Sequence, residues 1–91
     1  MIRDKLAEHY GDDLLFLEEE YFDRAIVGVV HQCNNTLVCY SQPMVIQLLM
    51  EYSEMDEEDA LDYFYFNVVG AYVGEKTPVF LELFPFEEFF E

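Results

Sequence analysis

Positively charged side chains are scarce in this sequence. Its 91 residues include four Lys and Arg against 20 Asp and Glu, so the formal net charge is −16 at pH 7. A surface this acidic repels nucleic acids and anionic membranes, and it attracts basic partners over long distances. Four dispersed cations do not form the basic patch that nucleic-acid binding requires. We therefore predict no direct binding to nucleic acid and no membrane contact, with solubility as the simplest use of the charge.

The sequence also lacks a long apolar segment. No run approaches the roughly 20 apolar residues of a transmembrane helix, and the N-terminal residues MIRDKLAEHYGDD lack the apolar core of a signal peptide. Only two cysteines are present, Cys33 and Cys39. With Asn34-Asn35 as the turn between them, their side chains are not opposite each other, so a disulfide is disfavoured. These features predict a soluble protein in a reducing, cytosolic environment.

Motifs for catalysis and cofactor binding are missing as well. The sequence has no Gly-x-Ser-x-Gly motif and no glycine-rich phosphate loop. Acidic groups such as Asp12-Asp13 and Glu18 to Glu20 lack the regular spacing of a calcium loop. We predict that the protein is not an enzyme and has no cofactor and no metal. A small metal-dependent enzyme is the least favoured alternative.

Apolar residues, by contrast, make up 53% of the chain and include nine Phe and seven Tyr, which is enough for a hydrophobic core. The length suits a single acidic α+β domain over residues 1–91. The β-branched run at 25–30 predicts a strand covered on both faces or in the centre of a small sheet. A turn at Asn34-Asn35 would complete a hairpin over 25–40. A third strand is predicted over 78–83.

Helices are predicted between the hairpin and the third strand. Ser41 is a suitable N-cap for a helix over 43–52, with Pro43 near its first position. Asp56 is a suitable N-cap for a helix over 57–69. A spacing of about 100° per residue predicts that one face of this second helix packs inward. The expected inward residues are Leu61, Phe64, Tyr65, Val68 and Tyr72. The fold class is thus α+β, with a small antiparallel sheet packed against the two helices.

The strongest indication of function is an acidic run without any Lys or Arg. Its seven carboxylates are Glu51, Glu54, Asp56, Glu57, Glu58, Asp59 and Asp62. Four of them, at 56–59, would also begin the second helix and complement its dipole, so folding alone accounts for part of the run. On the outer face of that helix, Asp62 is expected beside Tyr63 and Phe66. This mixture of acid and ring is typical of a recognition surface, although the C-terminal tail or a second subunit could equally cover the rings.

Two hypotheses about this surface follow. Residues three or four positions apart on a helix lie about 5–6 Å from each other, a spacing comparable to that of phosphates on a DNA strand. The first hypothesis is a DNA mimic that blocks a nucleic-acid-binding protein. The carboxylates at suitable positions are Glu51, Glu54, Glu58 and Asp62. In the second, a non-mimic interaction module, Tyr63, Phe66 and the Phe-rich tail at 85–91 carry the affinity while charge only steers association.

Residues 59–80, DALDYFYFNVVGAYVGEKTPVF, resemble a segment of a family of small, mostly uncharacterised phage and prophage proteins. The family segment reads approximately Glu-Tyr-Phe-x-Phe-Asn-x-x-Gly-Ala-Tyr-x-Gly-Glu-x-Thr-Pro-x-Phe. The matching residues here are Tyr63, Phe64, Phe66, Asn67, Gly70, Ala71, Tyr72, Gly74, Glu75, Thr77, Pro78 and Phe80. Asp62 stands where the family has Glu. Residues 23–30 and the hairpin are also similar, so the resemblance covers roughly two thirds of the chain.

The resemblance implies a phage origin and a location in the cytoplasm of an infected bacterium. It transfers no functional residue, because the family segment carries no assigned chemistry. Small acidic phage proteins often block host defences such as restriction enzymes and CRISPR effectors, so the likeness favours an inhibitor by analogy. The expected partner is a basic host protein or nucleoprotein complex, and a homodimer is compatible with the sequence. The alternative is an interaction module in phage replication or host takeover.

Overall fold

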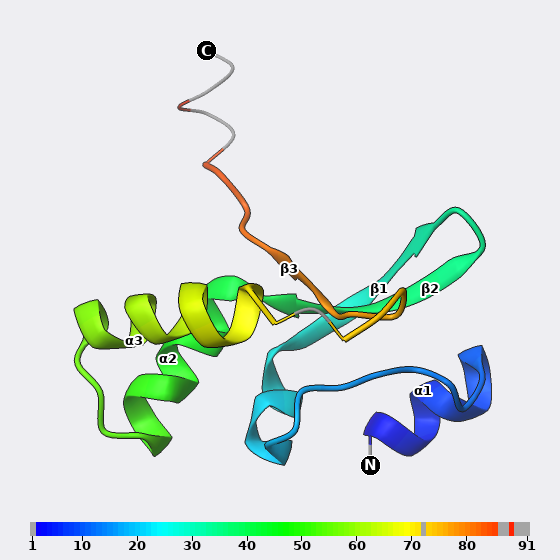
Figure 1. The fold of residues 1–91 in the computed structure, drawn as a ribbon, viewed down its shortest axis with the longest axis horizontal. Coiled ribbons are helices and arrows are strands. Elements are labelled where there is room, and N and C mark those ends of the chain that lie inside the picture. The colour runs from blue at the N-terminus through cyan, green and yellow to red at the C-terminus, as the bar shows by residue number, and fades with distance from the viewer. Residues whose placement is uncertain (1, 72, 86–87, 89–91) are drawn as a thin grey trace.

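A computed structural model describes residues 2–71, 73–85 and 88 of the protein. In chain order its elements are α1 (Ile2–Tyr10), the 3₁₀ helix η1 (Glu20–Ala25), β1 (Ile26–Gln32), β2 (Asn35–Ser41), α2 (Gln42–Tyr52), α3 (Glu57–Tyr63), the π-helix η2 (Phe64–Val69) and β3 (Val79–Leu81). Figure 1 shows the pair of helices α2 and α3 at one end of the molecule and α1 with the tip of the β1–β2 hairpin at the other.

The sheet has the strand order β1-β2-β3, and it is mixed. Strands β1 and β2 are antiparallel, whereas β3 pairs with β2 in the parallel direction. The α+β class is confirmed, but the prediction of an antiparallel sheet was wrong for its third strand. The chain leaves the end of β2 through the helices, and residues 73–78 lead into β3. It therefore enters β3 in the direction of β2, as a crossover connection between parallel strands requires.

The central strand is β2 and not β1. Four consecutive β2 residues, Leu37 to Tyr40, are buried, while Val27 in the edge strand β1 is 58% exposed. The expectation that the apolar run at 25–30 would be covered on both faces was therefore wrong. Ile26 pairs with Tyr40 and Gly28 with Cys39, so Val27 is an extra residue in β1. This shift is the β-bulge that a glycine within a strand indicates.

The hairpin turn lies one residue earlier than predicted. Gln32 pairs with Asn35, which leaves Cys33 and Asn34 as the two turn residues. Cys33 takes the positive φ of 55° that such a turn demands. Both cysteines are free thiols, and burial raises the pKa of the Cys39 thiol.

The helix caps agree with the sequence. The Ser41 hydroxyl accepts a hydrogen bond from the Met44 amide at 3.4 Å, and Asp56 accepts one from the Asp59 amide at 2.8 Å. These bonds satisfy amides at the beginning of α2 and α3 that have no partner within the helix. The predicted helix over 57–69 is present as α3 followed without a break by η2. Among the described helices the longest is α2, with 11 residues, and none has the length and apolar character that a bilayer crossing demands.

The inward face of this second helix agrees with the prediction only in part. Phe64 is fully buried and Leu61 and Val68 are partly buried, but Tyr65 is 52% exposed. Tyr65 instead accepts a hydrogen bond on its hydroxyl from the Gln42 side chain at 3.0 Å. The spacing of 100° ceases to hold at Phe64, because the i→i+5 bonds of a π-helix widen the turn. Tyr72 lies outside the described residues.

A polar network anchors the N-terminal segment to the core. The Arg3 guanidinium donates to both carboxylate oxygens of Asp23 at 2.9 Å and to the Leu17 carbonyl at 2.7 Å. It also lies 5.0 Å from the centre of the Phe16 ring. The Leu17 amide in turn donates to the hydroxyl of the buried Tyr40 at 2.8 Å. The segment at 16–17 is outside any helix or strand, and hydrogen bonds hold both main-chain polar groups of Leu17.

Tyr40 offers a test of this network. Tyr40→Phe is expected to lower the free energy of unfolding by about 1–2 kcal/mol at neutral pH, because the partly buried Leu17 amide loses its acceptor. Burial is the main cause that raises the pKa of Tyr40 above its ordinary value of 10.0, and the negative charge of Asp23 also raises it. The hydrogen bond from Leu17 and the positive charge of Arg3 lower the pKa, but by less. The unfolded chain therefore ionises first, so the stability that the buried neutral phenol contributes is fully present below pH 10.0 and is lost as the pH rises further.

Urea denaturation at pH 7 and at about pH 10.5 measures both effects. The wild type should lose more stability between the two pH values than Tyr40→Phe, which has no phenol at this position. An equal loss in the two proteins would mean that Tyr40 titrates as it does in the unfolded chain.

Candidate functional site

The seven carboxylates of the acidic run gather at the α2–α3 end of the molecule. Glu51 lies in the last turn of α2, Glu54 in the connection and Asp62 in the last turn of α3. Asp56, Glu57, Glu58 and Asp59 form the cap and first turn of α3. All seven side chains are exposed. We call this surface, which is at the left of Figure 1, the acidic end.

The acidic end is a cluster and not a single row of charges. Glu54 has a φ of +55°, a left-handed conformation that costs a residue with a side chain about 1–2 kcal/mol. The chain reverses here, and α3 packs back against α2. Of the four carboxylates expected at helical spacing, only Glu58 and Asp62 share one helix, one turn apart. The prediction that these four carboxylates form one regular row along a helix was therefore wrong, because the chain reverses direction between Glu51 and Glu58.

Folding uses part of this charge. The Asp56 carboxylate is the N-cap of α3, and the three acids that follow it lie where the helix dipole favours negative charge. Glu51, Glu54 and Asp62 have no such role. They are the members of the acidic end for which the fold provides no explanation.

Asp56→Ala is expected to lower the free energy of unfolding by about 1 kcal/mol, because the Asp59 amide loses its cap. Chemical denaturation measures this loss. The control is Asp62→Ala, which removes the same charge from the same helix and should stay within about 0.5 kcal/mol of the wild type. Equal effects would show that charge, and not the cap, controls the stability of α3.

No cation neutralises the acidic end in the part of the chain that the structure describes. The ion pairs there join Arg3 to Asp23 and Lys76 to Asp13. Arg24 donates a hydrogen bond to the Tyr52 hydroxyl at 3.2 Å, at the end of α2. Like charges gathered in this way produce a negative potential that extends into the solvent and attracts basic molecules.

The two aromatic rings predicted on the outer face are exposed, but their surroundings differ. Phe66 is 81% exposed, whereas Tyr63 is 38% exposed and forms part of the wall of a cavity. Such exposure of a Phe side chain forgoes roughly 2 kcal/mol of burial free energy. The prediction that the rings point away from the core is confirmed for Phe66, whereas the Tyr63 ring faces the cavity. The Phe-rich tail, also considered as a binding motif, has residues 86–87 and 89–91 outside the described residues.

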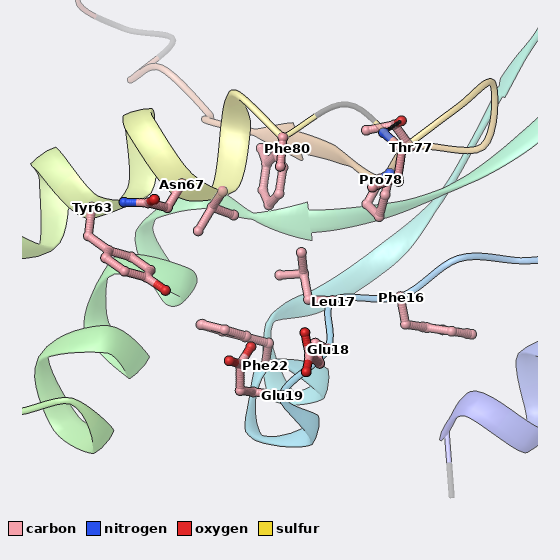
Figure 2. A pocket seen from close by; sticks show the side chains of 13 residues that line it. Phe16, Leu17, Glu18, Glu19, Phe22, Tyr63, Asn67, Thr77, Pro78 and Phe80 are labelled. Atoms are coloured by element: carbon pink, nitrogen blue, oxygen red, sulfur yellow. Dashed lines mark hydrogen bonds between the residues drawn. The ribbon is translucent and has the colours of Figure 1, made fainter.

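Sequence reasoning missed the cavity itself. Its volume is about 370 Å³, and it lies between the segment at 16–22 and the segment at 63–80. The lining residues are Phe16, Leu17, Glu18, Glu19, Phe22, Tyr63, Asn67, Val68, Ala71, Val73, Thr77, Pro78 and Phe80. In Figure 2 the Tyr63 ring extends from the helix toward the segment that carries Phe22 and Glu19. The change from apolar Phe16-Leu17 to acidic Glu18-Glu19 was the only signal in the sequence, and it does not indicate what lies opposite.

The structure also bears on the metal sites considered for the sequence. Within residues 2–71, 73–85 and 88, no three His, Cys, Asp or Glu side chains come close enough to share a metal ion. His31 lies within 3.3 Å of the Thr36 hydroxyl, and Cys33 and Cys39 lie in the hairpin turn and the central strand.

The fold and surface thus define a small acidic α+β protein whose charge is concentrated at the exposed end of a helix pair. Comparison with protein-family models, with curated proteins and with solved structures finds no match for the chain.

Proposed function

We propose that this protein is a phage-encoded inhibitor that binds a nucleic-acid-binding defence complex of the host and blocks its DNA- or RNA-binding surface. The observation that carries the proposal is the acidic end: seven exposed carboxylates, none of them in an ion pair with a described cation. A basic nucleic-acid-binding surface is the complement of such an end, because both rely on the same Coulomb attraction.

The net charge supports the same class of partner. At −16, the protein is attracted to basic surfaces before contact and repelled from nucleic acid, so it would compete with DNA without binding to it. The host complex would be a CRISPR effector or a restriction enzyme, and the protein would act in the bacterial cytoplasm. The resemblance to small phage and prophage proteins supports this setting by analogy.

The test begins with the immobilised protein and a bacterial lysate. Captured proteins are eluted at about 0.5 M salt, identified, purified, and assayed for nucleic-acid binding with and without this protein. The expected result is competitive inhibition that weakens steeply as salt increases, because counterion release drives the binding of both competitors. Capture that persists unchanged at this salt concentration, or a captured protein whose DNA binding is unaffected, would contradict the proposal.

The exposure of Phe66 favours a second candidate, an interaction module for phage replication or host takeover in which aromatic contacts supply the affinity. Surface plasmon resonance against the captured partner separates the two candidates. In the module, replacing Tyr63 and Phe66 with Ala abolishes binding, and reversing the charges of Glu57 and Glu58 slows only association. In the blocking inhibitor, charge reversal abolishes binding and the aromatic variant retains it.

A further inference from the structure

The cavity between segments 16–22 and 63–80 combines apolar walls with two exposed carboxylates. Phe22 is 3% exposed, and Leu17, Val68 and Phe80 are partly buried, so the walls provide rings and aliphatic surface. Glu18 and Glu19 line the same cavity and are exposed, which places them at its mouth. Figure 2 shows them on the side of Phe22, across the cavity from Asn67.

The two carboxylates at the mouth are not neutralised within the part of the chain that the structure describes. Arg3 and Lys76 pair with Asp23 and Asp13, so neither forms an ion pair with Glu18 or Glu19. The segment that carries them is nevertheless held in place. The Leu17 amide bonds to the Tyr40 hydroxyl at 2.8 Å, and the Leu17 carbonyl accepts from Arg3 at 2.7 Å. A binding wall that is already ordered does not lose that conformational freedom on binding.

The same segment already binds one guanidinium group. Arg3 lies over the Phe16 ring, pairs with the Asp23 carboxylate and donates to a main-chain carbonyl. These contacts correspond to the three properties of a guanidinium: a flat face, a positive charge and several N–H donors. Phe16 also lines the cavity. There, Glu18 and Glu19 provide carboxylates and Tyr63 provides an aromatic ring, as Asp23 and Phe16 do for Arg3.

We propose that this cavity is a receptor for an arginine side chain of a basic partner protein. The aliphatic stem would lie against Leu17 and Val68, as arginine stems do on apolar surfaces. The guanidinium would donate to Glu18 and Glu19 and stack against the Tyr63 ring. Arginine fits better than lysine, because an ammonium group offers no flat face and no fork of donors to a carboxylate. This inference rests on the proposed function for the partner, but it concerns the cavity and not the carboxylates of the acidic end.

The test uses the full-length protein and small probes, without any partner. N-acetyl-arginine amide is titrated into the labelled protein, and the amide signals of residues at the cavity and at the acidic end are followed by NMR. The expected result is a saturable shift at Leu17, Glu19, Asn67 and Val68, with a dissociation constant on the order of 1 mM. The uncharged isostere N-acetyl-citrulline amide should cause no saturable shift, and N-acetyl-lysine amide should bind about tenfold more weakly.

Two variants that remove the same charge provide the control. Glu18→Gln with Glu19→Gln should weaken the arginine probe about tenfold, because the charge-assisted hydrogen bonds are lost. Glu57→Gln with Glu58→Gln, at the acidic end, should leave the affinity nearly unchanged. Equal binding of citrulline or of lysine, shifts confined to 51–62, or equal effects of the two variants would each overturn the assignment. These results are independent of partner capture, so failure here leaves the proposed function standing, and the reverse also holds.

Discussion

Neutralising four carboxylates of the acidic end is expected to weaken binding to the captured partner about a hundredfold at low salt. The variant combines Glu51→Gln, Glu54→Gln, Glu58→Gln and Asp62→Asn. Each exposed charge pair contributes up to about 1 kcal/mol, and 1.4 kcal/mol corresponds to a factor of ten in affinity. The four together therefore account for roughly two factors of ten. Asp56 is left unchanged, because its carboxylate caps α3 and its loss would confuse stability with binding.

A matched variant distinguishes local charge from total charge. Glu8→Gln, Asp12→Asn, Glu75→Gln and Glu82→Gln also remove four negative charges, and all four positions are exposed and outside the acidic end. We expect this variant to slow association slightly, through weaker steering, and to change the dissociation rate little. Surface plasmon resonance at two salt concentrations measures both rates. If the two quadruple variants bind equally, the acidic end has no special role and only the net charge matters.

Phe64→Ala is expected to lower the free energy of unfolding by about 3–5 kcal/mol, a large part of the stability of a domain of this size. The ring is fully buried, and it meets Phe80 of β3 edge-on with ring centres 5.1 Å apart. Its loss leaves a cavity where η2 meets β3, and the surrounding residues can refill it only in part. Urea denaturation followed by circular dichroism measures the effect.

Phe66→Ala provides the control two residues away. The same chemical change at a side chain that is 81% exposed should alter stability by less than about 0.5 kcal/mol. Comparable destabilisation by both variants would mean that Phe66 is covered in solution, as it would be in a homodimer. Sedimentation of the wild type would then reveal the dimer. The pair of variants thus tests both the core and the exposure on which the second candidate function depends.

Local interactions made part of this fold predictable from sequence. The caps Ser41 and Asp56 act on amides within three residues, so the beginnings of α2 and α3 follow from nearest neighbours along the chain. The exposure of the acidic run is also a local property. The turn was predicted one residue too late. Both Cys33-Asn34 and Asn34-Asn35 can form a two-residue turn, and only the pairing of the two strands decides which of these pairs forms it.

The composition and order of residues thus determined the α+β class, the helix beginnings and the concentration of negative charge in one segment. Tertiary structure alone decided three further features: the parallel direction of β3, the π-helix that turns Tyr65 outward, and the cavity between Leu17 and Phe80. The strand direction and the cavity depend on residues far apart in the chain, which are brought together by the packing of whole elements. Negative charge can be counted in a sequence, but a cavity exists only once the two segments that line it have folded against each other.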